Sequence, residues 1–415
     1  MPRNNNIVAA LDTGTSKISC LIGEIHENNV LEVIGKGAAP SHGIKKGAIT
    51  DIDECAKTIE LAVMEAENQS GVRINSLLAG VSGEFIVSGT SRGKIKISGK
   101  NQEVTDGDIA KVMSSARMAK ICQDRRILHA EPMGYHIDGH NGIRNPVGMV
   151  GNKLEVDAYL IAGDNTYLQN IARTFQKSGL EMDLNDYVYS SLATANTVLD
   201  DSDKNLGVAL IDMGAGTTKI NVFKGGVLVH SRVLPLGGDN LTYDIAMTFK
   251  IPLCEAESLK ISKGCACPEL LSAEEEEEEV EAISFSESET LNIQRKMLSE
   301  IIEARLMDIF EGVRKELNRL GTGGIFVAGS MLTGGTARLK HINYLSQRVL
   351  EMPAKIGKPC NITGLGSWAG NPEYSSVTGI LQMAADRRIS SVARGQFGFA
   401  KRFCGRVFQW LQDVF

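Results

Sequence analysis

Ala209 to Ile220, Ala-Leu-Ile-Asp-Met-Gly-Ala-Gly-Thr-Thr-Lys-Ile, is the stretch that decides the fold. The apolar run before Asp212 is typical of a buried strand, and a strand pattern resumes at Ile220, so the stretch predicts a hairpin with a glycine tip. Gly214 and Gly216 would let the backbone turn through positive φ and would leave no Cβ between the amide groups and an anion. We therefore expect the tip to bind phosphate.

Asp212 lies where the first strand of this hairpin ends. Its carboxylate would repel a phosphate chain unless a divalent cation lay between them. Mg²⁺ keeps several of its waters and is commonly held by one or two carboxylates together with phosphate oxygens. Asp212 therefore predicts a Mg²⁺ site, with contact through bound water.

The chain carries a second copy of this pattern near its start. Ala9 to Ile18 reads Ala-Ala-Leu-Asp-Thr-Gly-Thr-Ser-Lys-Ile, with Asp12 at the end of an apolar strand. Its Thr-Ser-Lys-Ile matches Thr217 to Ile220, and on that match the first tip is two residues shorter. Two half-sites in one chain predict two related domains that face each other and bind one phosphate chain between them.

The pair of hairpins resembles the phosphate 1 and phosphate 2 motifs of the actin, Hsp70 and sugar-kinase superfamily. The third motif of that superfamily, a strand followed by a Gly-Gly turn and a helix, is present at Ser330 to Leu339. In order and spacing, nearly the whole chain resembles the FtsA family of actin-like bacterial cell-division proteins. Further matching pieces are Leu236 to Asp239, Glu257 to Lys260, Gly264 to Ala266 and Asn361 to Leu365.

The resemblance implies an α/β fold: an actin-like two-domain ATPase fold with an inserted small αβ domain and a C-terminal amphipathic helix. It implies ATP and Mg²⁺ in the cleft, and at most slow ATP hydrolysis, because no catalytic residue can be assigned. The implied phosphate residues are Thr13, Gly14, Thr15, Ser16, Lys17, Gly214, Ala215, Gly216, Thr217 and Thr218. Gly237 and Gly238 would line the cleft, Glu257 and Lys260 would reach the ribose, Gly334 and Gly335 would lie against the adenine, and Asp12 and Asp212 would hold Mg²⁺.

The predicted domain organisation follows from the positions of these motifs. Residues 84–162 show strand alternation around a helical segment and carry no phosphate motif, and the FtsA family has an inserted domain, called 1C, at this position. The full division is 1–83 and 163–205 for domain 1A, 84–162 for domain 1C, 206–244 and 318–389 for domain 2A, 245–317 for domain 2B, 390–398 for a linker and 399–415 for the terminal helix.

Several local elements are predicted from periodicity and capping signals. Asp51 provides an N-cap for a helix that ends near Gln69. Ser272 to Ser288 contains six consecutive glutamates, so we expect a solvated loop there. Other expected segments are strands at 85–87, 94–97, 128–137 and 154–161, helices at 108–119, 167–177, 186–198, 240–263 and 291–320, and a polar link at 200–205.

Composition excludes other classes of protein. The net charge of -6 argues against a general nucleic-acid binder, and no window holds the roughly 20 apolar residues of a membrane-spanning helix. The start of the chain does not have the pattern of a signal peptide. Cys265 and Cys267 are expected to be reduced thiols, and His129 and Glu131 are expected to be strand residues rather than metal ligands, since no Cys-x-x-Cys accompanies them. These features fit the cytoplasm.

The last residues, Phe399 to Phe415, follow a small, polar, glycine-containing segment. On a helix with about 100° per residue, the apolar side chains fall in one half of the wheel and the polar ones in the other. Such a helix is typical of one lying in the interface of an anionic membrane. A terminal helix docked on the protein's own core is the alternative. The apolar half includes Phe399, Phe403, Val407, Trp410, Leu411 and Val414.

The resemblance implies a protein that polymerises at the cytoplasmic face of the bacterial inner membrane, peripherally attached at the division site. It would tether the tubulin-like protein FtsZ, whose C-terminal peptide would bind domain 2B, and recruit other division proteins through domain 1C. Two other functions remain open: a small-molecule kinase of the same superfamily, and a pilus-type assembly adaptor. A kinase would need a further carboxylate over an acceptor hydroxyl, and neither alternative explains the tail.

Overall fold

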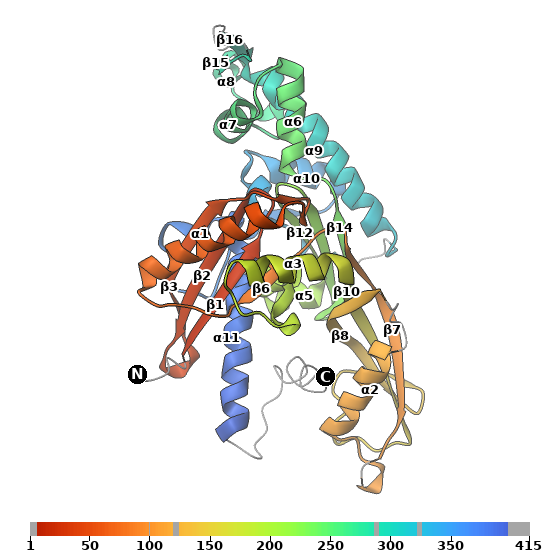
Figure 1. The fold of residues 1–415 in the computed structure, drawn as a ribbon. Coiled ribbons are helices and arrows are strands. Elements are labelled where there is room, and N and C mark those ends of the chain that lie inside the picture. Colours follow the sequence, from red (N-terminus) through yellow and green to blue (C-terminus); the bar gives the residue numbers. More distant parts are fainter. Residues whose placement is uncertain (1–5, 99, 119–123, 286–289, 322–325, 397–415) are drawn as a thin grey trace.

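Two five-stranded sheets form the body of the protein (Figure 1). The computed structural model describes residues 6–98, 100–118, 124–285, 290–321 and 326–396. In each sheet an opening strand pairs antiparallel with the strand that follows it and parallel with a later strand. The first sheet has the order β11-β6-β1-β2-β3, with β1 (Ile7–Thr13), β2 (Lys17–Ile25), β3 (Leu31–Pro40), β6 (Leu78–Val81) and β11 (Tyr187–Tyr189). The second has the order β14-β13-β12-β17-β18, with β12 (Val208–Met213), β13 (Thr218–Lys224), β14 (Val227–Leu234), β17 (Gly329–Thr333) and β18 (Ala354–Ile356). The duplicated topology confirms the predicted actin-like fold class.

The two hairpins have the same length, which corrects the sequence alignment. Asp12 pairs with Ser19 across β1 and β2, and Asp212 pairs with Lys219 across β12 and β13, at the same separation along the chain. Lys17 therefore corresponds to Thr217, and Lys219 corresponds to Ser19. The first tip is therefore not two residues shorter than the second. The alignment based on the shared Thr-Ser/Thr-Lys-Ile sequence is shifted by two residues from the alignment given by the strand pairing.

Helices cover the first sheet. α1 (Ile52–Ser70) begins at Asp51, whose carboxylate accepts from the N–H groups of Asp53 and Glu54, as predicted from the Asp cap. α3 (Asn165–Lys177) packs on α1, and α4 (Ser190–Val198) packs on α11 (Ser375–Gln396). The prediction of one helix over 186–198 was wrong at its start, because Tyr187–Tyr189 form the edge strand β11 and the helix begins only at Ser190. The predicted polar link at 200–205 is a short helix, α5 (Asp201–Leu206), capped by Asp200.

α11 packs on β1, β2 and β6, and its side chains Val377, Ile380 and Leu381 belong to the core of the first lobe. The sequence placed residues 318–389 in domain 2A, so for this helix that assignment was wrong (Figure 1). The predicted linker at 390–398 was wrong for residues 390–396, which continue the helix, and residues 397–398 lie outside the described part of the chain. The terminal segment 399–415, with its predicted membrane residues, lies outside the described residues.

The inserted unit is a four-stranded sheet with one covering helix. Its order is β7-β10-β8-β9, from β7 (Ile86–Lys96), β8 (Arg125–Ile137), β9 (His140–Ile143) and β10 (Lys153–Asp164), and α2 (Asp106–Met118) packs on β7. The two strand segments expected at 85–87 and 94–97 are one continuous strand, β7. This unit also contacts the second lobe: Tyr159 accepts from the backbone N–H of Ser231 at 2.7 Å, and Ser88 donates to the Ser231 carbonyl at 2.6 Å.

A helical unit projects from the second sheet at the top of Figure 1. It contains α6 (Gly238–Phe249), α7 (Leu253–Lys263), α8 (Ala273–Glu277), β15 (Glu279–Ile283), β16 (Thr290–Gln294) and α9 (Arg295–Asn318). The expected helix over 240–263 is divided where Lys250 adopts a left-handed conformation and Pro252 follows. The expected helix over 291–320 begins only at Arg295, because the residues before it form β16.

The glutamate run is not a simple solvated loop. Ser272 caps α8, and the carboxylates of the run form ion pairs with four cations from three other places in the fold. Glu275 lies 2.7 Å from Lys340 and 3.1 Å from Arg295, and the hydrogen bond from Lys340 lowers the pKa of Glu275 to about 2. Glu276 pairs with Lys296 and Glu278 with Lys263 and Arg295. The cations are far away in sequence, so the run alone could not predict these pairs.

Candidate nucleotide-binding site

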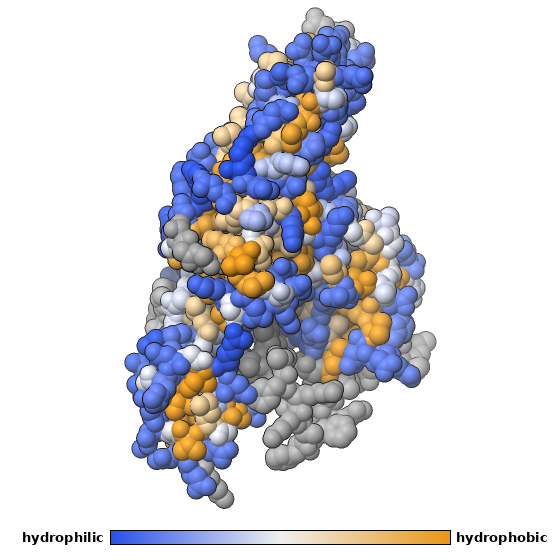
Figure 2. Space-filling view, turned by 180° about the vertical axis from the view of Figure 1, so that it is seen from behind, coloured by the Kyte–Doolittle hydropathy of each residue, from blue (hydrophilic) through white to orange (hydrophobic). Residues whose placement is uncertain are grey.

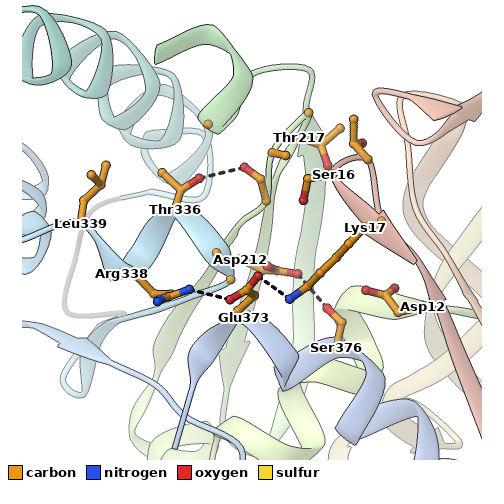
Figure 3. Close-up of a pocket in the computed structure, with 18 of the residues that line it drawn as sticks. Asp12, Ser16, Lys17, Asp212, Thr217, Thr336, Arg338, Leu339, Glu373 and Ser376 are labelled. Atoms are coloured by element: carbon orange, nitrogen blue, oxygen red, sulfur yellow. Dashed lines mark hydrogen bonds and ion pairs between the residues drawn. The ribbon is translucent and has the colours of Figure 1, made fainter. Parts of the chain in front are cut away.

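A cavity of about 330 Å³ lies between the two hairpins, at the junction of the two lobes (Figure 3). The predicted phosphate, Mg²⁺, ribose and adenine residues line it, with two exceptions. Thr218 is fully buried and donates its hydroxyl to the Leu236 carbonyl at 2.8 Å. Gly237 lies behind the second tip, in close contact with the carbonyls of Gly214 and Ala215. These two residues support the site and do not face the cavity.

The two hairpin tips approach each other closely. A Cβ built on Gly216 would lie 2.7 Å from the Thr15 hydroxyl of the first hairpin, which is closer than real Cβ contacts allow. Gly214 and Gly216 do not have positive φ, so the expectation that the tip needs them for a left-handed turn was wrong. At Gly216 the requirement for glycine comes from the approach of the opposite lobe.

The first turn of α6 anchors the second tip. The N–H of Gly238 donates to the Gly214 carbonyl at 3.0 Å, and the N–H of Asp239 donates to the Ala215 carbonyl at 2.8 Å. Thr336 donates its hydroxyl to the Gly214 carbonyl at 3.0 Å. The tip is therefore held from two sides, and its position is fixed relative to the later Gly-Gly turn.

Two carboxylates and one lysine lie at the floor of the cavity. The ammonium group of Lys219 donates to Asp212 at 2.9 Å, and both side chains are buried. Burial raises the pKa of Asp12 to about 6; Lys219 and Lys17 oppose this rise, and the Asp212 charge adds to it. Lys219 thus forms the ion pair with Asp212 and also attracts the charged form of Asp12. The donor set fits a hydrated Mg²⁺, which would supply the missing positive charge and shield phosphate oxygens from the carboxylates.

The side chain of Lys17 extends across the cavity toward Glu373 and Tyr374. It forms an ion pair with Glu373 and lies 3.7 Å from the centre of the Tyr374 ring. Arg338 donates to the other oxygen of the same carboxylate at 2.7 Å (Figure 3). The ring of Tyr374 stacks on Trp368 at 3.9 Å.

The predicted ribose residues form a connected cluster on α7. Lys260 is 2.6 Å from the Glu257 carboxylate and donates to the Gly238 carbonyl at 3.1 Å and to the Thr242 hydroxyl at 2.9 Å. Thr242 also donates to Glu257. Oxygen acceptors and a cation are therefore gathered at one wall of the cavity, where they could bind sugar hydroxyl groups.

The two glycines of the turn after β17, Gly334 and Gly335, differ in how much room they leave for a side chain. Gly334 has a φ of 88°, and a Cβ there would lie 2.5 Å from the Met213 carbonyl and 2.6 Å from an oxygen of Asp212. For Gly335 the nearest atom to a built Cβ is 3.9 Å away. Gly334 is therefore required for the close contact between β17 and the second hairpin, whereas Gly335 leaves open space in the cavity wall.

Comparison with known proteins identifies the family. The model of cell division protein FtsA matches residues 209–379, and the model of the SHS2 domain inserted in FtsA matches residues 83–162. The FtsA of Pseudomonas aeruginosa is 35% identical over 95% of this chain and 93% of that protein. The FtsA of Escherichia coli K12 is 32% identical over 99% of this chain and 97% of that protein.

The chain belongs to the FtsA family of cell division proteins. Solved structures with this fold include MreB5 of Spiroplasma citri bound to ADP, with a TM-score of 0.56, 13% identity and coverage of 94% of this chain and 99% of that one. The PilM-PilN type IV pilus biogenesis complex matches with a TM-score of 0.64, 14% identity and coverage of 91% and 98%. At such identities these structures show the actin-like fold.

Several cavity residues of this FtsA-family chain were not predicted as site residues, among them Lys219, Arg338, Glu373 and Ser376. Lys219 could have been found by pairing the strands in register, which places it opposite Asp212. Glu373 reaches the cavity from a short 3-10 turn (Pro372–Tyr374) far from both hairpins in sequence, and no local pattern marks it. In the part of the chain that the structure describes, no helix is both long enough and apolar enough to cross a membrane.

Proposed function

We propose that this FtsA-family protein binds ATP and Mg²⁺ between its two hairpins. The observation that carries this proposal is the cavity itself, where two equivalent hairpin tips face each other over a pair of carboxylates that share one lysine. Thr13 to Lys17 and Gly214 to Thr217 would bind phosphate, Asp12 and Asp212 would hold Mg²⁺ through water, and Glu257 and Lys260 would bind the ribose. The structure of MreB5 with ADP is a neighbour in fold that binds a nucleotide.

The proposed cellular role is an adaptor that polymerises at the inner membrane and tethers FtsZ. Large apolar side chains are exposed on the projecting helical unit, where a peptide from a partner could bind: Tyr243, Met247, Leu253, Ile261 and Ile283. Figure 2 shows apolar side chains on the surface of this projection. The helices and strand that carry them pack on one another. The inserted unit offers a separate surface for other division proteins.

Membrane attachment would come from Phe399 to Phe415, whose sequence places aromatic residues on one side of a helix and cations on the other. Cosedimentation with anionic vesicles tests the role. The full chain should sediment with vesicles, ATP should increase the sedimented fraction through polymer formation, and a chain ending at Gly398 should remain in solution. Equal sedimentation of the two chains would overturn the proposed membrane attachment.

The FtsZ part of the proposal has its own test. A synthetic peptide with the sequence of the FtsZ C-terminus should bind the full chain, and Met247→Glu, on the exposed face of α6, should weaken that binding. Leu61→Glu is a matched control, because Leu61 is similarly exposed but lies on α1 in the first lobe. Equal binding by both variants would exclude the helical unit as the peptide site.

A further inference from the structure

Glu373 lies inside the cavity between two cations that come from opposite lobes. Lys17, at the start of β2, donates to one oxygen of the carboxylate, and Arg338, from the second lobe, donates to the other at 2.7 Å. About a fifth of the surface of the Lys17 and Glu373 side chains is exposed, so solvent screens this contact only partly. Figure 3 shows the carboxylate between the two cations.

A lysine and an arginine that converge on one anion are the partners that a phosphoryl group would take in this cavity. Lys17 follows the first tip directly and lines the same cavity as Thr217, its structural counterpart in the second tip. We infer that Glu373 competes with the nucleotide: its carboxylate pairs with Lys17 and Arg338, and a bound phosphate must displace it. This inference rests on the proposed function, and it gives Glu373 the role of lowering nucleotide affinity.

The backbone beside Glu373 is held in place. The Pro372 carbonyl accepts from the N–H of Gly334 at 3.1 Å and from the Thr333 hydroxyl at 3.2 Å, and the Asn371 side chain accepts from the N–H of Glu373. The segment continues directly into α11. Displacement of the carboxylate therefore requires only a change of side-chain conformation at Lys17, Arg338 and Glu373.

Tyr374 and Trp368 form an aromatic pair beside Lys17, so the fluorescence of Trp368 can detect this displacement. Lys17 lies over Tyr374, and Tyr374 stacks on Trp368 with an interplanar angle of 4°. When Lys17 moves from Glu373 toward a phosphate, the positive charge beside this pair moves as well. The chain has two tryptophans, so Trp410→Phe leaves Trp368 as the single tryptophan and makes its emission a direct signal.

The decisive experiment compares ATP–Mg²⁺ affinity in the full chain and in Glu373→Gln by calorimetry. The glutamine keeps the shape but removes the charge, so affinity should rise about tenfold, as expected from removing one like charge beside a phosphate in a partly screened site. Glu60→Gln is the charge-matched control, because Glu60 is exposed on α1. This control variant should bind ATP–Mg²⁺ with the same affinity as the native sequence. In Lys17→Gln combined with Glu373→Gln the gain should be lost.

Unchanged or weaker affinity in Glu373→Gln, while the native sequence binds ATP, would overturn the inference and leave the proposed function intact. Absence of binding in every variant would overturn the proposed function instead. Trp368 emission keeps the test valid if Glu373→Gln does not fold. In the Trp410→Phe chain, added pyrophosphate with Mg²⁺ should change the emission of Trp368; unchanged emission at saturating pyrophosphate would contradict the displacement of Lys17.

Discussion

Lys219 and Asp212 face each other directly across β12 and β13, and the ammonium group lies 2.9 Å from the carboxylate in the buried floor of the cavity. Asp12 lies in the same charge cluster, and its pKa is raised to about 6. Lys219 therefore pairs with Asp212 and, together with Lys17, opposes the effect of burial on the pKa of Asp12. This relationship links the stability of the second hairpin to the electrostatics of the proposed Mg²⁺ site.

Replacement of Lys219 by methionine should lower the free energy of unfolding by about 3 kcal/mol, because it leaves a buried carboxylate without its partner. Lys224→Met, at the exposed end of the same strand, is the matched control and should change stability by less than about 0.5 kcal/mol. Urea unfolding measures both. Similar stabilities for the two variants would show that the Lys219 ion pair contributes little to the fold.

Gly334→Ala should be strongly destabilising and Gly335→Ala should be tolerated. At Gly334 the added methyl group would meet the Met213 carbonyl at 2.5 Å in a backbone conformation with φ of 88°, whereas at Gly335 the nearest atom is 3.9 Å away. We expect a loss of about 2 kcal/mol or more for the first variant and less than about 1 kcal/mol for the second. Thermal unfolding checks this difference, and equal losses would refute the claim that Gly334 fixes the contact between β17 and the second hairpin.

Glu131, on β8, provides a prediction of pH dependence. Burial raises the pKa of its carboxyl to about 7, one of its oxygens is buried without a hydrogen bond among the described residues, and Arg117 only partly opposes the rise. The unfolded chain loses this proton near the ordinary value of about 4.5, so the folded state is favoured at low pH and loses that advantage as the pH rises to about 7. Glu131→Gln should be more stable than the native sequence at pH 8, by on the order of 2 kcal/mol, and the difference should shrink toward pH 5. A difference that is constant with pH would contradict this assignment.

The local elements of the fold could be predicted from the sequence, and the long-range pairs could not. The Asp51 cap and the two glycine hairpins are encoded within a few residues, so pattern alone located them. The true correspondence of the hairpins needed strand register, because a repeated Thr-Ser/Thr-Lys-Ile motif suggested a match displaced by two residues. Glu373 is separated from Lys17 by most of the chain, and the partners of the glutamate run come from other elements. Ion pairs of this kind depend on tertiary packing and leave no local signal.

The terminal segment should attach to membrane mainly through its aromatic side chains. Burial of an aromatic side chain contributes on the order of 2 kcal/mol, whereas a basic residue near an anionic surface contributes about 1 kcal/mol that salt screens. Trp410→Glu should therefore release the protein from vesicles, and Arg406→Gln should only weaken binding and make it less sensitive to salt. Vesicle flotation at low and high salt distinguishes these outcomes. Retention of Trp410→Glu on vesicles would place the membrane attachment elsewhere in the chain.

The most direct test of the central claim, that one nucleotide binds between the two hairpins, is calorimetric titration of ATP–Mg²⁺ into the full chain and into Gly216→Val. A Cβ at Gly216 would lie 2.7 Å from the Thr15 hydroxyl, so valine would force the tips apart without touching the ribose residues. We predict one ATP per chain for the native sequence and an affinity at least about tenfold weaker for Gly216→Val, with removal of Mg²⁺ by a chelator weakening the native affinity as well. Equal affinities for the two chains, with or without Mg²⁺, would contradict the account.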